Sequence, residues 1–189
     1  MELLKNKIRQ EGTVLNNSIL KVDSFLNHQI DPVLMFQMGE EFARRFKDSG
    51  ATKILTIEAS GIAVALTTGY KMNLPLVFAR KRKSVLMNEE AYMTNVFSYT
   101  KKEYSDITVL KKFLSAGEKI LIIDDFLASG EAALGLANLV EQAGSQVVGI
   151  GIVIEKTFQP GAEKLRKSNY HLESLVRIQS FEDGKVNFI

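Results

Sequence analysis

The residues best suited to chemistry are two adjacent carboxylates, Asp124 and Asp125, which follow the apolar run Ile120–Ile123. A short apolar run without alternation is typical of a strand that is buried on both faces of a parallel sheet. Ligands of open α/β sheets bind at the carboxyl ends of such strands. Paired acids at that position suit the two hydroxyls of a ribose or a divalent cation, although an Asp there can also simply cap the next helix.

The segment after the two acids combines small residues with the start of a predicted helix. Its backbone N–H groups, together with the positive end of the helix dipole, suit a phosphate. The residues concerned are Ala128, Ser129, Gly130, Glu131 and Ala132. Together with the acids, this segment predicts a sugar-phosphate site.

A second strand-to-helix turn follows the predicted strand Lys53–Ile57 and contains Glu58, Ala59, Ser60 and Gly61. Its backbone N–H groups could hold a second anion. The alternative is an ordinary connection in which glycine allows tight packing. The presence of the first site at the same sheet edge favours anion binding.

The basic run Arg80–Lys83 follows the predicted strand Leu76–Ala79. Such a run can be a solvated surface or a nucleic-acid patch. It can also supply cations that offset charge on a departing anion. We take Lys81 as the candidate, although the sequence does not decide which cation of the run acts.

Strand and helix patterns alternate along the chain. The predicted fold is therefore α/β, with a central, mostly parallel sheet flanked by helices. Residues 80–103 lack a sustained apolar period and predict a long loop or a projecting hairpin around residues 95–100. The remaining expected elements are helices at 1–10, 32–49, 62–72, 131–143 and 158–168, an irregular stretch at 16–30, and strands at 120–123, 147–154, 172–178 and 186–189.

Length and composition argue against several classes of function, among them nucleic-acid binding and membrane proteins. The 189 residues fit one domain, and a net charge of +2 argues against nucleic acid as the main partner. Cysteine is absent, and His28 and His171 lie far apart, so we predict no metal site built by the protein alone. The N-terminus lacks a signal-peptide pattern and no apolar run is long enough to cross a membrane, so we expect a cytoplasmic protein without membrane partners.

The order of four apolar residues, two acids, two apolar residues and a small-residue loop resembles the type I phosphoribosyltransferases, which use phosphoribosyl pyrophosphate (PRPP). Five segments resemble the xanthine-specific members of this family, which act in bacterial purine salvage. They are LKVDSFLNHQIDP, TIEASGIA, FARKRKS, IDDFLASGEA and IEKTFQPG. The resemblance implies transfer of the 5-phosphoribosyl group of PRPP to N9 of xanthine, with Mg²⁺ bound mainly through PRPP. It also implies a homodimer.

The resemblance assigns site residues as well. Leu20, Asn27 and Lys156 match positions that contact xanthine, and Phe158 could stack on its ring. Residues 1–31 would form a hood over the base, and residues 32–189 the core of the same domain, with a flexible closing loop near 80–105. The implied catalytic residues are Asp124, Asp125, Glu58 and Lys81. Ala59 to Gly61 and Ala128 to Ala132 would bind PRPP.

Two departures from the family pattern leave alternatives open. The loop reads Ala-Ser-Gly-Glu-Ala where many members have Thr-Gly-Gly-Thr after the Ala, so the Glu131 carboxylate must turn away from the phosphate or find a cation. Ala128 replaces an acidic residue of hypoxanthine-guanine enzymes, so the substrate enters as its anion or Glu58 accepts its proton. The rival functions are an adenine- or orotate-type enzyme and a PRPP-sensing domain like those of purine repressors.

Overall fold

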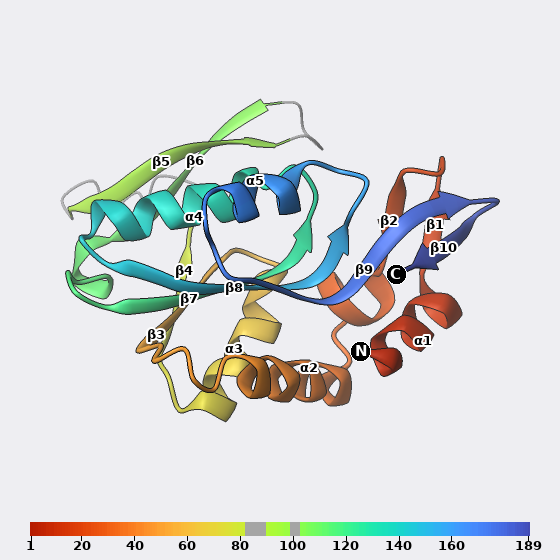
Figure 1. Cartoon of the computed structure of the whole chain (residues 1–189), viewed down its shortest axis with the longest axis horizontal. Helices are drawn as coiled ribbons and strands as arrows, with labels where there is room; N and C mark the ends of the chain where they lie inside the picture. Colours follow the sequence, from red (N-terminus) through yellow and green to blue (C-terminus); the bar gives the residue numbers. More distant parts are fainter. Residues whose placement is uncertain (82–89, 99–102) are drawn as a thin grey trace.

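A six-stranded sheet forms the centre of the computed structural model, which describes residues 1–81, 90–98 and 103–189. The strand order is β10-β9-β8-β7-β3-β4, and every neighbouring pair is parallel except β10 with β9 (Figure 1). This confirms the predicted sheet. The strands are β3 (Lys53–Ile57), β4 (Leu76–Ala79), β7 (Lys119–Leu127), β8 (Gln146–Lys156), β9 (Leu172–Glu182) and β10 (Lys185–Phe188).

Helices cover both faces of this sheet. In Figure 1, α2 (Pro32–Arg45) and α3 (Gly61–Met72) lie on one face, while α4 (Glu131–Gln142) and α5 (Gly161–Lys167) lie on the other. Alternate residues of β7 enter different cores. Leu121 and Ile123 pack on the side of α2 and α3, and Ile120 and Ile122 on the side of α4. Because both faces are buried, the strand carries no polar alternation.

The central strand is longer than predicted. β7 continues through Asp124 and Asp125 to Leu127, because Phe126 and Leu127 pair with Ile154 and Glu155 of β8. The two acids therefore lie within the last part of the strand instead of just after it. The Ala128–Glu131 turn begins where this pairing stops.

The N-terminal segment packs beside β9 and β10 (Figure 1). It consists of α1 (Glu2–Glu11), a hairpin of β1 (Thr13–Leu15) and β2 (Ile19–Lys21), and one π-helical turn at Asp23–Asn27. The Met1 amino group donates to the Leu175 carbonyl at 2.7 Å. The stretch expected to be irregular thus contains elements too short to show a periodicity.

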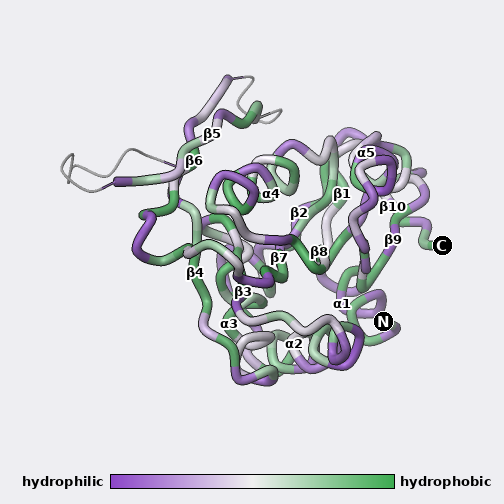
Figure 2. Tube along the Cα trace, turned by 60° about the vertical axis from the view of Figure 1, so that its left-hand side comes forward, coloured by the Kyte–Doolittle hydropathy of each residue, from purple (hydrophilic) through white to green (hydrophobic). Residues whose placement is uncertain are grey.

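A hairpin of β5 (Ala91–Ser98) and β6 (Glu103–Leu110) projects from the body of the molecule (Figure 2). A hairpin was expected around residues 95–100, but β6 itself was not. Its buried residues, Ile107 and Val109, alternate with polar ones and pack over α4. A Cβ added at Gly135 of α4 would lie 2.5 Å from Val96 Cγ2, so glycine allows this close approach. Residues 82–89 and 99–102, which belong to the expected loop, lie outside the described residues.

Two glycines of β8, Gly149 and Gly151, make room for two aromatic rings, one in α2 and one directly after it. A Cβ at Gly149 would lie 2.5 Å from Phe46, and one at Gly151 would lie 2.8 Å from Phe42. Their spacing superficially resembles a dinucleotide-binding fingerprint, but the glycines sit inside a buried strand and serve packing. In the part of the chain that the structure describes, no helix is long and apolar enough to cross a membrane.

Replacing Gly151 by Ala should lower the free energy of unfolding by about 1–3 kcal/mol, because the added methyl group overpacks the contact with Phe42. Equilibrium urea denaturation measures this change. Gln146→Ala, at an exposed position of the same strand, is the control and should be nearly neutral. Equal stability of the two variants would contradict the packing role.

Candidate active site

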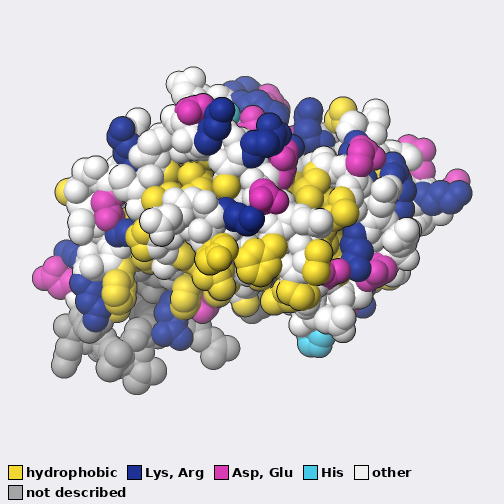
Figure 3. Space-filling view, turned by 90° about the horizontal axis from the view of Figure 1, so that it is seen from below, with side chains coloured by type: hydrophobic (Ala, Val, Ile, Leu, Met, Phe, Trp, Pro, Cys, Tyr) yellow, Lys and Arg dark blue, Asp and Glu magenta, His cyan; other side chains and the backbone are white. Residues whose placement is uncertain are grey.

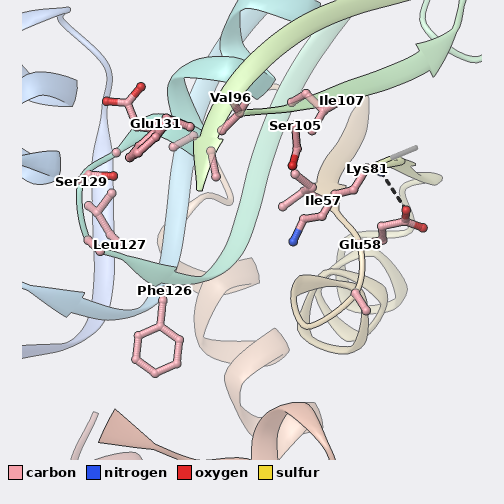
Figure 4. Close-up of a pocket in the computed structure, with 16 residues that line it drawn as sticks. Ile57, Glu58, Lys81, Val96, Ser105, Ile107, Phe126, Leu127, Ser129 and Glu131 are labelled. Carbon is pink, nitrogen blue, oxygen red and sulfur yellow. Dashed lines mark hydrogen bonds between the residues drawn. The ribbon is translucent and has the colours of Figure 1, made fainter. Parts of the chain in front are cut away.

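The ends of β3 and β7 open into a cavity of about 490 Å³ (Figure 4). Its walls come from the turns after these two strands, the start of α4 and the β5–β6 hairpin. The structure thereby brings together two loops that the sequence predicted as anion sites. The lining residues are Ile57, Glu58, Ala59, Lys81, Val96, Phe97, Ser105, Ile107, Phe126, Leu127, Ala128, Ser129, Gly130, Glu131, Ala132 and Ala133.

All five residues of the predicted phosphate loop, Ala128 to Ala132, line this cavity. Gly130 has a φ of 86°, the left-handed conformation that glycine adopts without strain, and α4 begins at the next residue. Within the described part of the chain, no side chain caps the helix. The first N–H groups of α4 therefore keep donor capacity for an anion at the positive end of the helix dipole.

The Glu131 carboxylate has a cationic partner, as the sequence required. Lys164 Nζ of α5 lies 2.7 Å from Glu131 Oε1. This partner could not be found from the sequence, because the two residues are distant along the chain and neither belongs to a pattern that points to the other. The fold brings them together.

The two acids of β7 are desolvated. Asp124 is buried, and its Oδ1 accepts from the Asp125 N–H at 3.0 Å, while Asp125 Oδ1 accepts from the Phe126 N–H at 2.9 Å. Burial, together with the neighbouring Asp125 charge, raises the pKa of Asp124 well above its ordinary value. Burial also raises the pKa of Asp125. The positive charge of Lys81 favours ionisation of both carboxyls. Neither acid is among the residues lining the cavity, although Phe126, directly after them, is.

Gly61 sits where β3, β7 and α3 meet. A Cβ there would lie 2.2 Å from Thr56 Oγ1 and 2.9 Å from Asp124 Oδ1. The Thr56 hydroxyl is fully buried and has no hydrogen-bond partner among the described residues. Close packing thus explains the glycine at position 61. Neither Ser60 nor Gly61 lines the cavity, so the turn reaches it through Glu58 and Ala59.

The Glu58 carboxylate holds the start of the basic run. Its Oε1 accepts from the Lys81 backbone N–H at 2.8 Å, and Arg80 Nε lies 3.8 Å from its Oε2. The peptide bond between Glu58 and Ala59 is cis. Figure 4 shows the Lys81 side chain extending into the cavity. The remaining cations and Ser84 of the predicted run lie outside the described residues.

The candidate base-binding lysine, Lys156, connects the core to the N-terminal segment. Its Nζ donates to the Ser18 carbonyl at 3.2 Å and lies 5.8 Å from the centre of the Phe126 ring and 5.7 Å from that of Phe181. Burial lowers the pKa of this ammonium group. Phe158, the candidate for stacking, packs edge-on against Phe181 with ring centres 5.5 Å apart.

The two other predicted base contacts differ in exposure. Leu20 is buried in β2 as part of the hydrophobic core, and Asn27 is exposed at the end of the π-helical turn. Neither lines the cavity. The residues that the sequence reasoning missed are Phe126, Phe181 and the hairpin wall at Val96, Phe97, Ser105 and Ile107.

Residues 35–184 match the phosphoribosyl transferase domain, and the chain belongs to this family of proteins. Relatives with similar sequences over the whole chain have a more specific name than the family. Xanthine phosphoribosyltransferase of Moorella thermoacetica is 57% identical over 189 residues, which cover 100% of this chain and 96% of the relative. The enzyme of the same name from Acinetobacter baumannii is 54% identical, covering 100% of this chain and 99% of the relative. The family resemblance inferred from the sequence is thus confirmed.

Solved structures show the same fold. Adenine phosphoribosyltransferase from Rhodothermus marinus matches with a TM-score of 0.76 at 20% identity, covering 94% of this chain and 100% of the other. The enzyme from Giardia lamblia also gives a TM-score of 0.76, at 19% identity, covering 93% of this chain and 98% of the other. At such identities the likeness concerns the fold alone.

The raised pKa of Asp124 gives a stability prediction. The native carboxyl holds its proton at pH values where the unfolded one, with a pKa near 3.8, has lost it, so wild-type stability falls as pH rises above that value. Asp124→Asn has no such loss. The variant should therefore be more stable than wild type at pH 7.

Urea denaturation between pH 3 and pH 8 measures this difference, which should shrink as the pH falls towards 3. Asp48→Asn is the control, because the Asp48 side chain is 89% exposed. A variant that is less stable than wild type at pH 7 would contradict the account.

Proposed function

We propose that this chain transfers the 5-phosphoribosyl group of PRPP to N9 of xanthine, giving xanthosine 5′-monophosphate and pyrophosphate in purine salvage. One observation carries the proposal: two turns predicted to bind anions, at Ala128–Ala132 and Glu58–Ala59, line one cavity at the ends of neighbouring parallel strands. A substrate with a phosphate at one end and a pyrophosphate at the other fits this arrangement. The names of the full-length relatives supply the choice of xanthine.

PRPP would lie across the strand ends. The N–H groups at the start of α4 suit its 5-phosphate. Asp124 and Asp125 suit the ribose hydroxyls, which requires Asp125, the more exposed acid, to turn towards the sugar. Glu58, Ala59 and the Lys81 ammonium, which line the cavity, would hold the pyrophosphate, and Ser60 and Gly61 complete the turn.

Mg²⁺ fits this site only together with the substrate. Within residues 1–81, 90–98 and 103–189, no three acidic or histidine side chains gather closely enough to hold a metal. Mg²⁺ usually keeps several waters and binds through one or two carboxylates plus substrate phosphates. Bound through PRPP, it would neutralise charge on the leaving pyrophosphate.

The base would lie between the core and the N-terminal hood, residues 1–31. The Lys156 contact with the Ser18 carbonyl supports this placement, because it joins the hood to the core beside Phe126, which lines the cavity. Xanthine carries ring carbonyls that accept hydrogen bonds from Lys156 and Asn27. Leu20 would contribute through the apolar packing of β2 within the hood.

The reaction is a displacement at the ribose carbon that carries pyrophosphate. N9 of xanthine forms the new bond while the bond to the pyrophosphate oxygen breaks, and pyrophosphate leaves with the electron pair. Positive charge develops on the ribose, so catalysis consists mainly of positioning and of stabilising the leaving group. The base loses its proton by one of two routes: xanthine enters as its anion, or Glu58 accepts the proton.

The adenine-type rival fits these residues less well. Adenine carries an amino group where xanthine carries a carbonyl, and the Lys156 ammonium can donate but not accept. The sensor alternative predicts PRPP binding without turnover, which the assay of pyrophosphate release distinguishes from catalysis.

The direct test is pyrophosphate release from PRPP and Mg²⁺ with xanthine, guanine, hypoxanthine or adenine supplied separately. Xanthine should turn over fastest.

Lys156→Gln should lower kcat/KM for xanthine roughly 10- to 100-fold, because it removes a charged hydrogen-bond donor. Lys167→Gln, at an exposed cation of α5, is the control. Equal rates with adenine would overturn the choice of base, and PRPP binding without turnover would indicate a sensor.

We also propose that the chain forms a homodimer through the outer face of α2 and α3. Figure 3 shows hydrophobic side chains gathered on this face. They include Phe36, Leu66 and Tyr70, which are 47%, 58% and 72% exposed, and the rings of Phe36 and Tyr70 are in edge-on contact. A two-fold axis would place this patch against its own copy, which covers apolar surface on both chains.

Leu66→Glu should shift the chain from dimer to monomer, because it places a charge within this apolar patch. Light scattering coupled to size-exclusion chromatography measures the mass. Lys185→Glu, an exposed position on β10, should leave the mass unchanged. A dimer that survives Leu66→Glu would place the interface elsewhere.

A further inference from the structure

The phosphate loop contains an electrostatic conflict. Glu131 is the first residue of α4, where the backbone N–H groups are arranged to receive a phosphate, and its carboxylate brings negative charge to the same place. An unpaired carboxylate there would repel a phosphate dianion and compete for the same helix end. The structure resolves this conflict with a side chain from another element, Lys164.

Backbone contact fixes the position of α5 relative to the loop. The Gly161 N–H donates to the Ala128 carbonyl at 2.9 Å. A Cβ at Gly161 would lie 2.5 Å from that carbonyl oxygen and 2.7 Å from the Gly130 nitrogen, so only glycine permits this approach. Lys164 lies one turn further along α5, which directs its side chain to the start of α4.

The sheet anchors the other side of α5. Ala162 and Leu165 are buried in the core that lies above β7 and β8. Arg166 lies 3.7 Å from the carboxylate of Glu155, a buried residue that also accepts from Ser174 at 2.6 Å. Lys164 therefore projects from a fixed platform. Its ammonium meets the Glu131 carboxylate at 2.7 Å, and both side chains are only partly exposed.

We propose that Lys164 is a positioning residue for PRPP binding. Lys164 neutralises Glu131 and keeps the Glu131 carboxylate turned away from the N–H groups at the start of α4. This inference rests on the proposed function and deepens it. Lys164 acts through Glu131, so its removal should weaken PRPP binding only while Glu131 is charged.

A double-mutant cycle tests whether the effect of Lys164 on PRPP binding depends on the charge of Glu131. Lys164→Met, which keeps much of the apolar stem, should raise KM for PRPP about three- to tenfold and leave kcat within about twofold, as expected for the loss of a partly exposed charge pair beside a phosphate. Glu131→Gln should leave KM unchanged or lower it. The double variant should return KM to the value of Glu131→Gln, and Lys164→Arg should behave as wild type. Lys167→Met, on the same helix, is the control.

Calorimetric binding of ribose 5-phosphate separates this inference from the proposed function, because it requires no turnover. The affinities of the variants for ribose 5-phosphate should follow the same order as their KM values for PRPP. Urea denaturation verifies that each variant is folded. A double variant as weak as Lys164→Met would overturn the proposal, since Lys164 would then contact the phosphate or only support the fold. Wild-type KM in Lys164→Met would overturn it as well. Failure of wild type to convert xanthine would refute the proposed function alone.

Discussion

Because β7 pairs in parallel with β3 on one side and with β8 on the other, the three strands end at the same edge of the sheet. This pairing places the turn after Ile57, the acids of β7 and Lys156 of β8 along one edge, although they are far apart in the chain. The apolar side chains of β7 enter two separate cores, which hold the strand from both faces. This edge of the sheet can therefore carry charged side chains without losing the apolar support of the strands.

The same arrangement places charge where burial disfavours it. Asp124 and Asp125 have raised pKa values because they are desolvated, and the Thr56 hydroxyl beside Asp124 is buried without a partner among the described residues. Such groups reduce stability and are typical of binding sites. The ion pair with Lys164 offsets the negative charge that Glu131 brings to the phosphate loop. The apolar packing of α2 and α4 on the sheet offsets these costs.

The features that the sequence predicted correctly are local ones. The buried strand, the loop at Ala128–Ala132 and the helix after it follow one another directly, so composition and turn chemistry define them. Contacts between distant segments were not predictable in this way: Lys164 with Glu131, Lys156 with the Ser18 carbonyl, and the hairpin wall at Val96 and Ile107. The strand containing Ile107 was missed because its first half, Glu103–Asp106, is mostly polar, so that the apolar alternation covers only Ile107 and Val109. The prediction that Asp124 follows the end of its strand was wrong, because pairing with β8 extends β7 to Leu127.

The central claim is that the strand ends form one substrate site, with the phosphate at α4 and the base at Lys156. A crystal structure with bound xanthosine 5′-monophosphate tests this claim most directly. We expect the 5′-phosphate against the N–H groups at the start of α4, the ribose hydroxyls beside Asp124 and Asp125, and a purine carbonyl within hydrogen-bond distance of Lys156 Nζ. A nucleotide whose phosphate lies away from residues 128–132, or whose base lies away from Lys156, would contradict the account.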